Sequence, residues 1–272
     1  MNPFDVSIVI CSYKSPELLR LCIESIQRNV KDITYEIIVA DSATEEPTAM
    51  MMREDFPEIR FFSFKENVGF QRLVRKGLEA SKANHMLILN ADILVKPEAL
   101  EKMLAFMHEH TEIGMLGPQL LNFNETFQES CFRFYKPYTI LYRRTFLRKL
   151  GFAKRHLEWF SMQDYDHKEP KEVDWLMGSV MLVSREAVEK VGYMDPGFFM
   201  YMEDVDWCRR FWEAGYKVVY YPYVQMYHYH GKGSAKGGFL RSLLFNRLTW
   251  HHIASAWHYF RKYSGKSLPN HD

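Results

Sequence analysis

The sequence predicts an α/β fold in which a mostly parallel central sheet is flanked by helices. Short apolar runs rich in β-branched residues occur at 6–11, 36–41, 60–64 and 86–89, and such runs are typical of buried strands. Segments with apolar residues at helical spacing lie between or after them, at 16–26, 70–82 and 97–110. Strands that alternate with helices form βαβ units, whose strands run parallel.

Composition narrows the class of protein. The 272 residues suit one large domain or one domain with an appendage. Hydrophobic residues make up 47% of the chain, enough for a buried core, and the formal net charge is +1. Proteins that bind nucleic acid usually carry a strongly basic face, so we expect no nucleic-acid partner.

Cysteine usage and hydropathy point to the cytoplasm. The four cysteines form no C-x-x-C pair, which indicates reduced thiols in the core. The N-terminus lacks a signal-peptide pattern, and no run approaches the ~18 apolar residues of a spanning helix. We therefore expect a cytoplasmic protein that is soluble or lies on a membrane surface.

The second half of the chain is less regular. It contains an expected strand at 180–183, a short helix at 205–214 and a strand at 217–221. A glycine-rich basic loop follows at 231–238, and apolar residues near one face predict a closing helix from 240 to 260. The chain shows no internal repeat.

Polar residues at the strand ends are the first candidates for a site, because ligands bind outside the carboxyl ends of parallel strands. Ser12 and Tyr13, Asp41 and Ser42, and the pair Asn90 and Asp92 stand at such ends. Asp92 suits Mg²⁺ or Mn²⁺, which prefer oxygen ligands and keep positions open for a diphosphate. Asp41 suits a ribose hydroxyl or a base N–H. Both aspartates are equally typical of turns.

Glu203, Asp204 and Asp206 form a dense group of carboxylates after an aromatic run and before a helix. A carboxylate crowded by others can have a raised pKa and act as a general base toward a hydroxyl. The alternative is structural, because acidic residues are favoured at the N-terminus of a helix.

His228 and His230 flank Tyr229 just before the glycine-rich loop that contains Lys232. Two histidines beside such a loop are typical of a phosphate or metal site, although a single histidine is more often structural. The chain has no Walker A motif, and no G-x-G-x-x-G follows the first strand, so no dinucleotide cofactor is expected.

Taken in order, these segments resemble glycosyltransferase family 2, which has the GT-A fold, and especially its rhamnosyltransferase-like members. The likeness rests on the opening strand and loop at 7–13, the E-N-x-G-F segment at 66–70, the N-x-D form of the metal motif at 87–92, the segments 173–179 and 198–206, and the histidine motif at 228–231. It spans roughly residues 6 to 234.

The resemblance implies a role for each matching residue. Asp204 would be the catalytic base with Glu203 as second choice, Asp92 would bind the metal, and His228 would contact the metal or the diphosphate. The acceptor would meet Trp175, Gly178 and Asp206. The donor would meet Ser12, Tyr13, Asp41, Asn67, Gly69, Phe70, Asn90, Ala91 and Lys232. The GT-A domain would cover 1–235, with a nucleotide-sugar half at 1–120 and an acceptor half at 121–235, and 236–272 would be a C-terminal helical extension.

The resemblance also implies a reaction. An inverting, metal-dependent transferase would move a sugar, first of all L-rhamnose from dTDP-rhamnose, to a hydroxyl of a glycan or lipid-linked glycan in cell-surface polysaccharide synthesis. UDP-hexose and UDP-galactofuranose are alternative donors, and a non-catalytic module that binds a glycan or partner is an alternative class. Segments 143–160 and 239–263 mix aromatic and basic residues, which predicts contact with the inner face of the cytoplasmic membrane or, equally, packing on the domain or on the second subunit of a homodimer.

Overall fold

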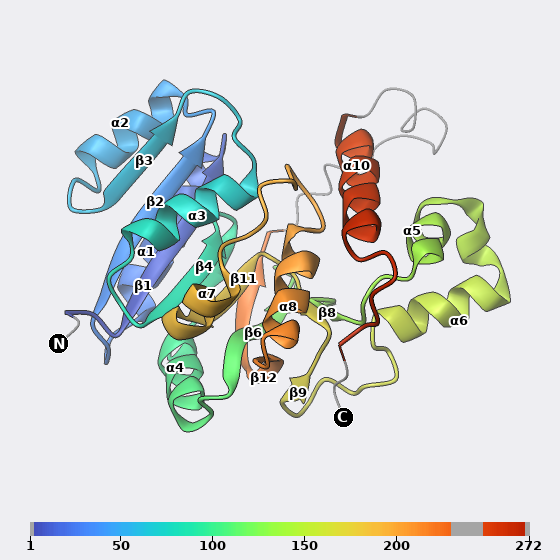
Figure 1. Cartoon of the computed structure of the whole chain (residues 1–272). Coiled ribbons are helices and arrows are strands. Elements are labelled where there is room, and N and C mark those ends of the chain that lie inside the picture. Colours follow the sequence, from blue (N-terminus) through green and yellow to red (C-terminus); the bar gives the residue numbers. More distant parts are fainter. Residues whose placement is uncertain (1–2, 230–246, 270–272) are drawn as a thin grey trace.

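The computed structural model describes residues 3–229 and 247–269 (Figure 1). Its first half confirms the predicted βαβ pattern. Four parallel strands lie in the order β3-β2-β1-β4, with bounds β1 Val6–Tyr13, β2 Tyr35–Ser42, β3 Arg60–Phe64 and β4 His85–Asn90. Their helices are α1 Pro16–Asn29, α2 Glu46–Glu54, α3 Phe70–Ala80 and α4 Ala99–Glu109.

The second half extends the same sheet in the order β11-β6-β12-β5. Strand β11 (Val180–Ser184) runs antiparallel to β4 and β6 (Ile113–Leu121), whereas β12 (Lys217–His228) runs parallel to β6. The short strands β5 (Ile93–Val95) and β9 (Lys171–Glu172) pair with β12, and β7 (Phe127–Gln128) pairs with β6. Strands β8 (Cys131–Phe132) and β10 (Trp175–Leu176) form a separate ribbon.

Five helical segments and one single-turn helix belong to this half in the described residues. They are α5 Pro137–Arg144, η1 Phe146–Lys149, α6 Gly151–Phe160, α7 Arg185–Val191, α8 Glu203–Glu213 and α10 Arg247–Lys262. None of the described helices is long and apolar enough to cross a membrane.

Successive side chains of the central strands point to opposite faces of the sheet, so they belong to two hydrophobic cores, one on each face. Ile8 and Ile10 of β1 pack with residues of α1, α2 and α4, whereas Val9 and Cys11 pack with residues of α3, α7 and α8. All four cysteines are buried and none forms a disulfide.

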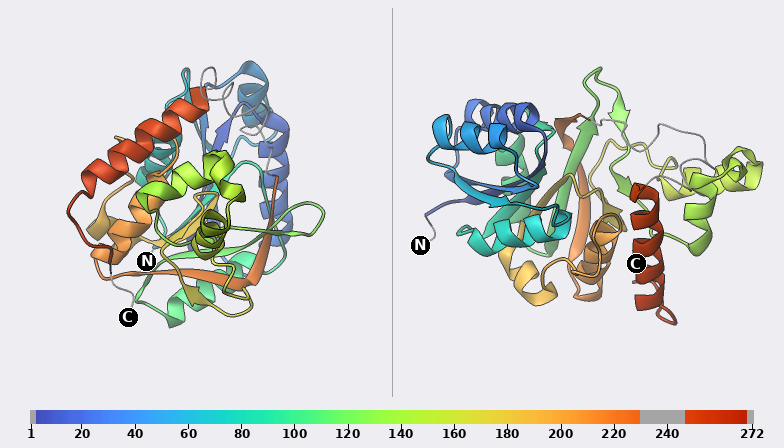
Figure 2. Two further views of the ribbon diagram at one scale, coloured as in Figure 1. Left: turned by 90° about the vertical axis from the view of Figure 1, so that its right-hand side faces the viewer. Right: turned by 90° about the horizontal axis from the view of Figure 1, so that it is seen from above.

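Helix α10 joins the second core. Its Tyr259 and the following Tyr263 are buried with residues of α8, and the Arg209 guanidinium of α8 donates to the carbonyl of Ser267 at 2.8 Å. Figure 2, left, shows α10, α5 and α6 together on one side of the molecule. The expected C-terminal helix is thus packed against the α/β domain within the chain.

Candidate active site

A pocket of about 370 Å³ opens at the carboxyl ends of β1, β2 and β4. This is the edge at which a parallel sheet binds its ligands. Asp92 lies in its wall, together with seven of the residues predicted to meet a donor, namely Ser12, Tyr13, Asn67, Gly69, Phe70, Asn90 and Ala91. The strand ends bring together residues that are up to eighty positions apart in the sequence.

The wall between β3 and α3 is shaped by Asn67 and Gly69. The Asn67 Oδ1 accepts hydrogen bonds from the Gly69 amide at 3.1 Å and from the Ser42 hydroxyl at 3.3 Å. Gly69 has φ +80°, and a Cβ placed there would lie 2.5 Å from the carbonyl oxygen of Phe199. Glycine is needed because an L side chain would be strained and would collide with that backbone.

Asp41 and Ser12 are register partners across β2 and β1, so their side chains lie on the same face of the sheet. Asp41 is fully buried. Neither its carboxylate oxygens nor the Ser12 hydroxyl has a hydrogen-bond partner among the described residues. Buried polar atoms are rarely left without partners, and Ser12 lines the pocket. The Ser12 hydroxyl is therefore available to a ligand in the pocket, whereas Asp41 is not among the residues that line it.

Asp92 and His228 meet from the ends of two strands. The Oδ1 of Asp92, just after β4, lies 3.4 Å from the Nε2 of His228, the last residue of β12. The Nδ1 of His228 lies 2.7 Å from the Oε1 of Gln128 in β7. The amide oxygen of Gln128 only accepts, so Nδ1 donates this hydrogen bond and the ring directs Nε2 toward Asp92.

This pair fits a divalent cation. The Asp92 Oδ1 is buried and has no hydrogen-bond partner within the described residues. Carboxylate oxygen suits Mg²⁺ and Mn²⁺, and neutral imidazole is a common metal ligand. In the part of the chain that the structure describes, no three His, Cys, Asp or Glu side chains gather as a metal cluster. A cation held here would therefore complete its ligands with diphosphate oxygens and water.

Glu203 and Asp204 begin α8. The Asp204 Oδ2 accepts a hydrogen bond from the Gly178 amide at 3.0 Å, and its Oδ1 accepts one from the Val205 amide at 2.9 Å. The Glu203 side chain is buried, and its Oε2 has no partner among the described residues, whereas Asp204 is partly exposed. The two neighbours therefore differ in their access to solvent and in their hydrogen bonds.

Burial raises the pKa of both carboxyls, and the hydrogen bonds to Asp204 keep its pKa the lower of the two. Burial, and after it the negative charge of Asp204, raises the pKa of Glu203 to about 8. Burial raises the pKa of Asp204 to about 6, against the lowering effect of the hydrogen bonds from Gly178 and Val205. Glu203 therefore holds its proton to higher pH than Asp204 does.

A short backbone bridge connects Asp204 to the pocket. A Cβ on Gly178 would lie 3.3 Å from the Phe70 ring and 3.4 Å from Asp204 Oδ2, and Phe70 lines the pocket. The carbonyl of the next residue, Ser179, accepts a hydrogen bond from the Asn90 amide at 2.9 Å. The Asp204 carboxylate is thus placed beside the pocket wall by the turn that precedes β11.

Two residues expected to meet the acceptor, Asp206 and Trp175, are buried and hydrogen-bonded within the chain. Asp206 is fully buried, its Oδ2 accepts from Arg210, and its Oδ1 accepts from Tyr263 and Lys262. It has no surface for an acceptor and instead ties α8 to α10. Trp175 is 6% exposed, stacks on Phe132, and donates its indole N–H to the backbone, so it belongs to the aromatic core below the acceptor half.

Other residues of the site were not predicted. Gln128 orients His228, and Met200 and Tyr229 add to the pocket wall. Ser42, which follows Asp41 at a strand end and was a candidate for that reason, also lines the pocket. Lys232, expected to hold phosphate, lies outside the described residues.

Sequence comparisons find rhamnosyltransferases among the relatives of this chain. An L-rhamnosyltransferase from Mycobacterium tuberculosis, named for N-acetylglucosaminyl-diphospho-decaprenol, is 26% identical over 213 residues, which are 74% of this chain and 68% of that protein. The rhamnosyltransferase WbbL of Escherichia coli is 24% identical over 236 residues, covering 82% of this chain and 83% of that one.

The fold matches a solved structure, that of GalNAc-T7 with UDP, GalNAc and Mn²⁺. The TM-score is 0.62 at 17% identity, over 86% of this chain but only 45% of the other. This match confirms the GT-A fold. The family model described as glycosyltransferase-like family 2 matches residues 3–251. The chain therefore belongs to glycosyltransferase-like family 2.

Proposed function

We propose that this protein transfers a sugar from a nucleotide-sugar donor to an acceptor hydroxyl, with Asp204 as the general base. The observation that carries the proposal is the backbone bridge from Asp204 through Gly178 to Phe70 in the wall of the pocket. It sets a carboxylate next to a pocket lined by residues that the resemblance assigns to the donor.

The donor nucleotide occupies the pocket in this proposal. Asp41 and Ser12 accept hydrogen bonds from the nucleoside, and Asp92 and His228 face its diphosphate. A divalent cation, Mg²⁺ or Mn²⁺, bound by Asp92 and His228 would stabilise the negative charge that develops on the leaving diphosphate. The GalNAc-T7 structure holds Mn²⁺ together with UDP, which supports a cation of this kind.

The reaction is a single displacement. Asp204 takes the proton of the acceptor hydroxyl while that oxygen bonds to the anomeric carbon. The bond from the anomeric carbon to the diphosphate oxygen breaks, and the nucleoside diphosphate leaves with the electron pair, so the configuration inverts. Ionised Asp204 suits this role, whereas Glu203 keeps its proton below about pH 8.

The sugar and acceptor are proposed from relatives. Two rhamnosyltransferases are among the most similar proteins, which favours dTDP-L-rhamnose as donor over UDP-hexose or UDP-galactofuranose. The name of the mycobacterial relative favours a lipid-linked glycan as acceptor. A non-catalytic binding module is disfavoured because Asp92, His228 and Asp204 all stand in positions that suit the chemistry.

A lipid-linked acceptor requires contact with a membrane. Helices α5, α6 and α10 lie together on one side of the molecule (Figure 2, left). Large apolar residues of α5, η1, α6 and α10 are exposed, among them Phe146 at 76% and Trp257 at 62%. Basic side chains lie in the same helices, at 143, 144, 148, 149, 154 and 155. We propose that this side lies on the cytoplasmic face of an anionic membrane. Flotation with anionic vesicles tests it, and a homodimer through α10 would instead give a concentration-dependent mass and no flotation.

The experiment that tests the reaction is a donor panel. Each nucleotide sugar is incubated with a short-chain N-acetylglucosaminyl-diphospho-polyprenol, with Mn²⁺, Mg²⁺ or EDTA, and transfer is scored by mass spectrometry. We expect rhamnosyl transfer that EDTA abolishes and excess cation restores. Transfer from no donor in any condition would contradict the proposal, and full transfer in EDTA would remove the metal from it.

A further inference from the structure

The segment 198–202, which leads into α8, has an unusual backbone. Tyr201 and Met202 have φ values of 69° and 68°, so two successive non-glycine residues adopt the left-handed conformation. Such residues persist only where their surroundings hold them. The amide of Asp206 donates to the carbonyl of Met202 at 2.9 Å, so this backbone sets the first turn of α8, which carries Asp204.

Helix α10 supplies much of that support along the segment. The Ser255 hydroxyl is buried and donates a hydrogen bond to the carbonyl of Met200 at 2.8 Å. Three histidine rings of α10 lie 4.7 to 4.9 Å, between ring centroids, from three aromatic rings of the segment; the pairs are His258 with Phe198, His251 with Phe199 and His252 with Tyr201.

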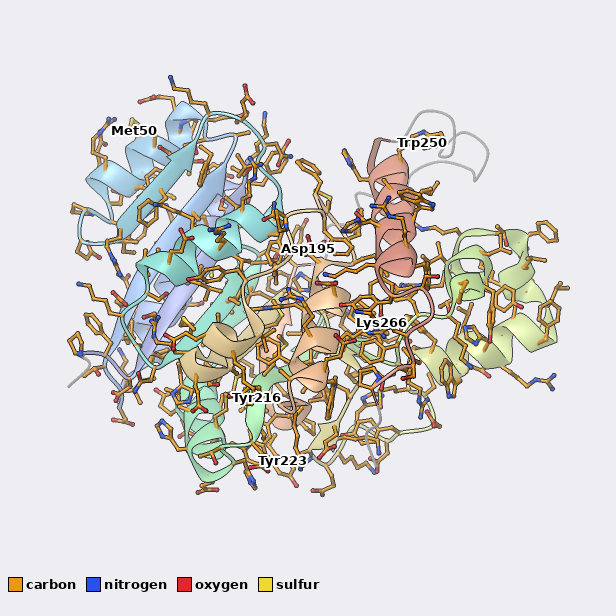
Figure 3. All side chains as sticks on the ribbon, in the orientation of Figure 1. Met50, Asp195, Tyr216, Tyr223, Trp250 and Lys266 are labelled. Atoms are coloured by element: carbon orange, nitrogen blue, oxygen red, sulfur yellow. The ribbon has the colours of Figure 1, made fainter. Side chains whose placement is uncertain are left out.

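A second anchor lies two residues beyond the base. The Nζ of Lys262 is 2.6 Å from Asp206 Oδ1 and 2.6 Å from Asp195 Oδ2. The hydroxyl of Tyr263 donates to Asp206 Oδ1 at 2.9 Å. Asp195, in the segment between α7 and α8, is labelled in Figure 3. These contacts fix the first turn of α8 from the side of α10.

The other side of the segment faces the pocket. Met200 lines it, and the Phe199 carbonyl abuts Gly69 so closely that a Cβ there would come within 2.5 Å of it. The segment is therefore held between α10 and the pocket. A shift of α10 would move both a part of the pocket wall and the carboxylate of Asp204.

The family model ends at residue 251, whereas α10 continues to Lys262. We propose that α10 completes the acceptor side of the active site, and that Ser255 and Tyr263 are positioning residues that hold Asp204 toward the acceptor. The inference rests on the proposed function, because it takes Asp204 as the base. Neither residue touches the reacting atoms, so each acts through the segment that it holds.

The first test is Ser255→Ala, assayed with dTDP-L-rhamnose and a short-chain N-acetylglucosaminyl-diphospho-polyprenol. We expect transfer to fall by about fivefold, the effect of losing one buried hydrogen bond, while the KM for the donor stays the same. Hydrolysis of the donor per sugar transferred should rise, because the variant still binds the donor but holds the base in the wrong place. This ratio does not depend on how much of the enzyme is folded.

The control is Ala254→Ser, which places a hydroxyl on the exposed side of α10. It should transfer as the unaltered chain does, and the double variant Ala254→Ser/Ser255→Ala should behave as Ser255→Ala. If Ser255→Ala fails to fold, Tyr263→Phe keeps the ring and removes only the hydrogen bond to Asp206. It should raise the same ratio of hydrolysis to transfer.

These variants distinguish the role of α10 from the role of Asp204 as the base. If both variants keep the unaltered ratio and rate while Asp204→Asn is inactive, the role of α10 is wrong and the proposed function stands. If Asp204→Asn transfers normally, the base assignment itself fails. A raised ratio in Ser255→Ala or Tyr263→Phe, together with an inactive Asp204→Asn, supports both.

Discussion

The Asp204 carboxylate accepts a hydrogen bond of 3.0 Å from the backbone N–H of Gly178. This bond joins the first turn of α8 to the turn that precedes β11, a strand in the middle of the sheet. A catalytic group supported by a central strand is held more rigidly than one on a free loop. The proposed base is therefore built on the same sheet that forms the donor pocket.

The pH dependence of transfer follows from the pKa of Asp204. Burial raises that pKa to about 6, and a base acts only when ionised, so kcat should rise with pH through about pH 6 and level off above it. The measurement is kcat with saturating donor and cation from about pH 5 to about pH 8. A rate that is constant over that range would contradict the assignment.

Glu203 should make the stability of the fold fall as the pH rises, whereas kcat rises. Burial raises its folded-state pKa from 4.5 to about 8, so between these values the folded state holds a proton that the unfolded state releases. Stability therefore falls as pH rises through this window. In Glu203→Gln the fall should be smaller, and its Tm should gain on the unaltered chain as pH rises. Glu54→Gln, at an exposed position of α2, should show no such gain.

Gln128 should control the affinity for metal. Its Oε1 accepts from His228 Nδ1 at 2.7 Å and so directs Nε2 toward Asp92. Loss of such a partner typically weakens metal binding by roughly 10–100-fold. We expect Gln128→Leu to weaken Mn²⁺ binding to this extent, measured by the EPR signal of free Mn²⁺, and Gln128→Glu to retain binding because it keeps an acceptor oxygen. Equal affinities in all three proteins would refute this role.

Gly69 should be sensitive to substitution. Its φ is +80°, and an added Cβ would lie 2.5 Å from the carbonyl oxygen of Phe199. We therefore expect Gly69→Ala to lower the free energy of unfolding by about 1–3 kcal/mol or more. Gly151, at the start of α6, has nothing within 4 Å of an added Cβ. Gly151→Ala should therefore leave stability nearly unchanged. Urea titration of both variants makes the comparison, and equal losses would contradict the account.

Much of the donor site was predictable because the strand signal is local. Runs such as 6–11 and 86–89 mark buried strands, and parallel strands all end at one edge, so Ser12 and Asn90 were expected to meet there. No knowledge of distant contacts was needed. In the structure both residues line the same pocket.

Strand β6 was missed, and β12 was expected to end at Tyr221. Both contain a proline, which removes a ladder hydrogen bond and is unusual in a central strand. In the structure Tyr221 pairs with Pro118, and the register between β12 and β6 shifts just after it, between Tyr221 and Gln225. This irregularity accommodates both Pro118 and Pro222. A sequence rule that treats proline as the end of a strand cannot foresee such paired exceptions.

The roles of Asp206 and Gln128 depend on tertiary contacts. Asp206 has the same local pattern as Asp204, but its ion pair with Lys262 and its hydrogen bond from Tyr263 come from a helix far along the chain. Gln128 sits in a two-residue strand without any periodic signal. Neither role is encoded near the residue itself.

Asp204→Asn tests the central claim most directly, because it removes the basic carboxylate and changes almost nothing in shape. The measurement is transfer from the best donor of the panel, with binding of Mn²⁺ and nucleoside diphosphate followed by calorimetry in the same preparation. We predict that transfer falls by about 10²–10⁴-fold while binding is retained. Transfer at the unaltered rate, with binding intact, would contradict the claim that Asp204 is the base.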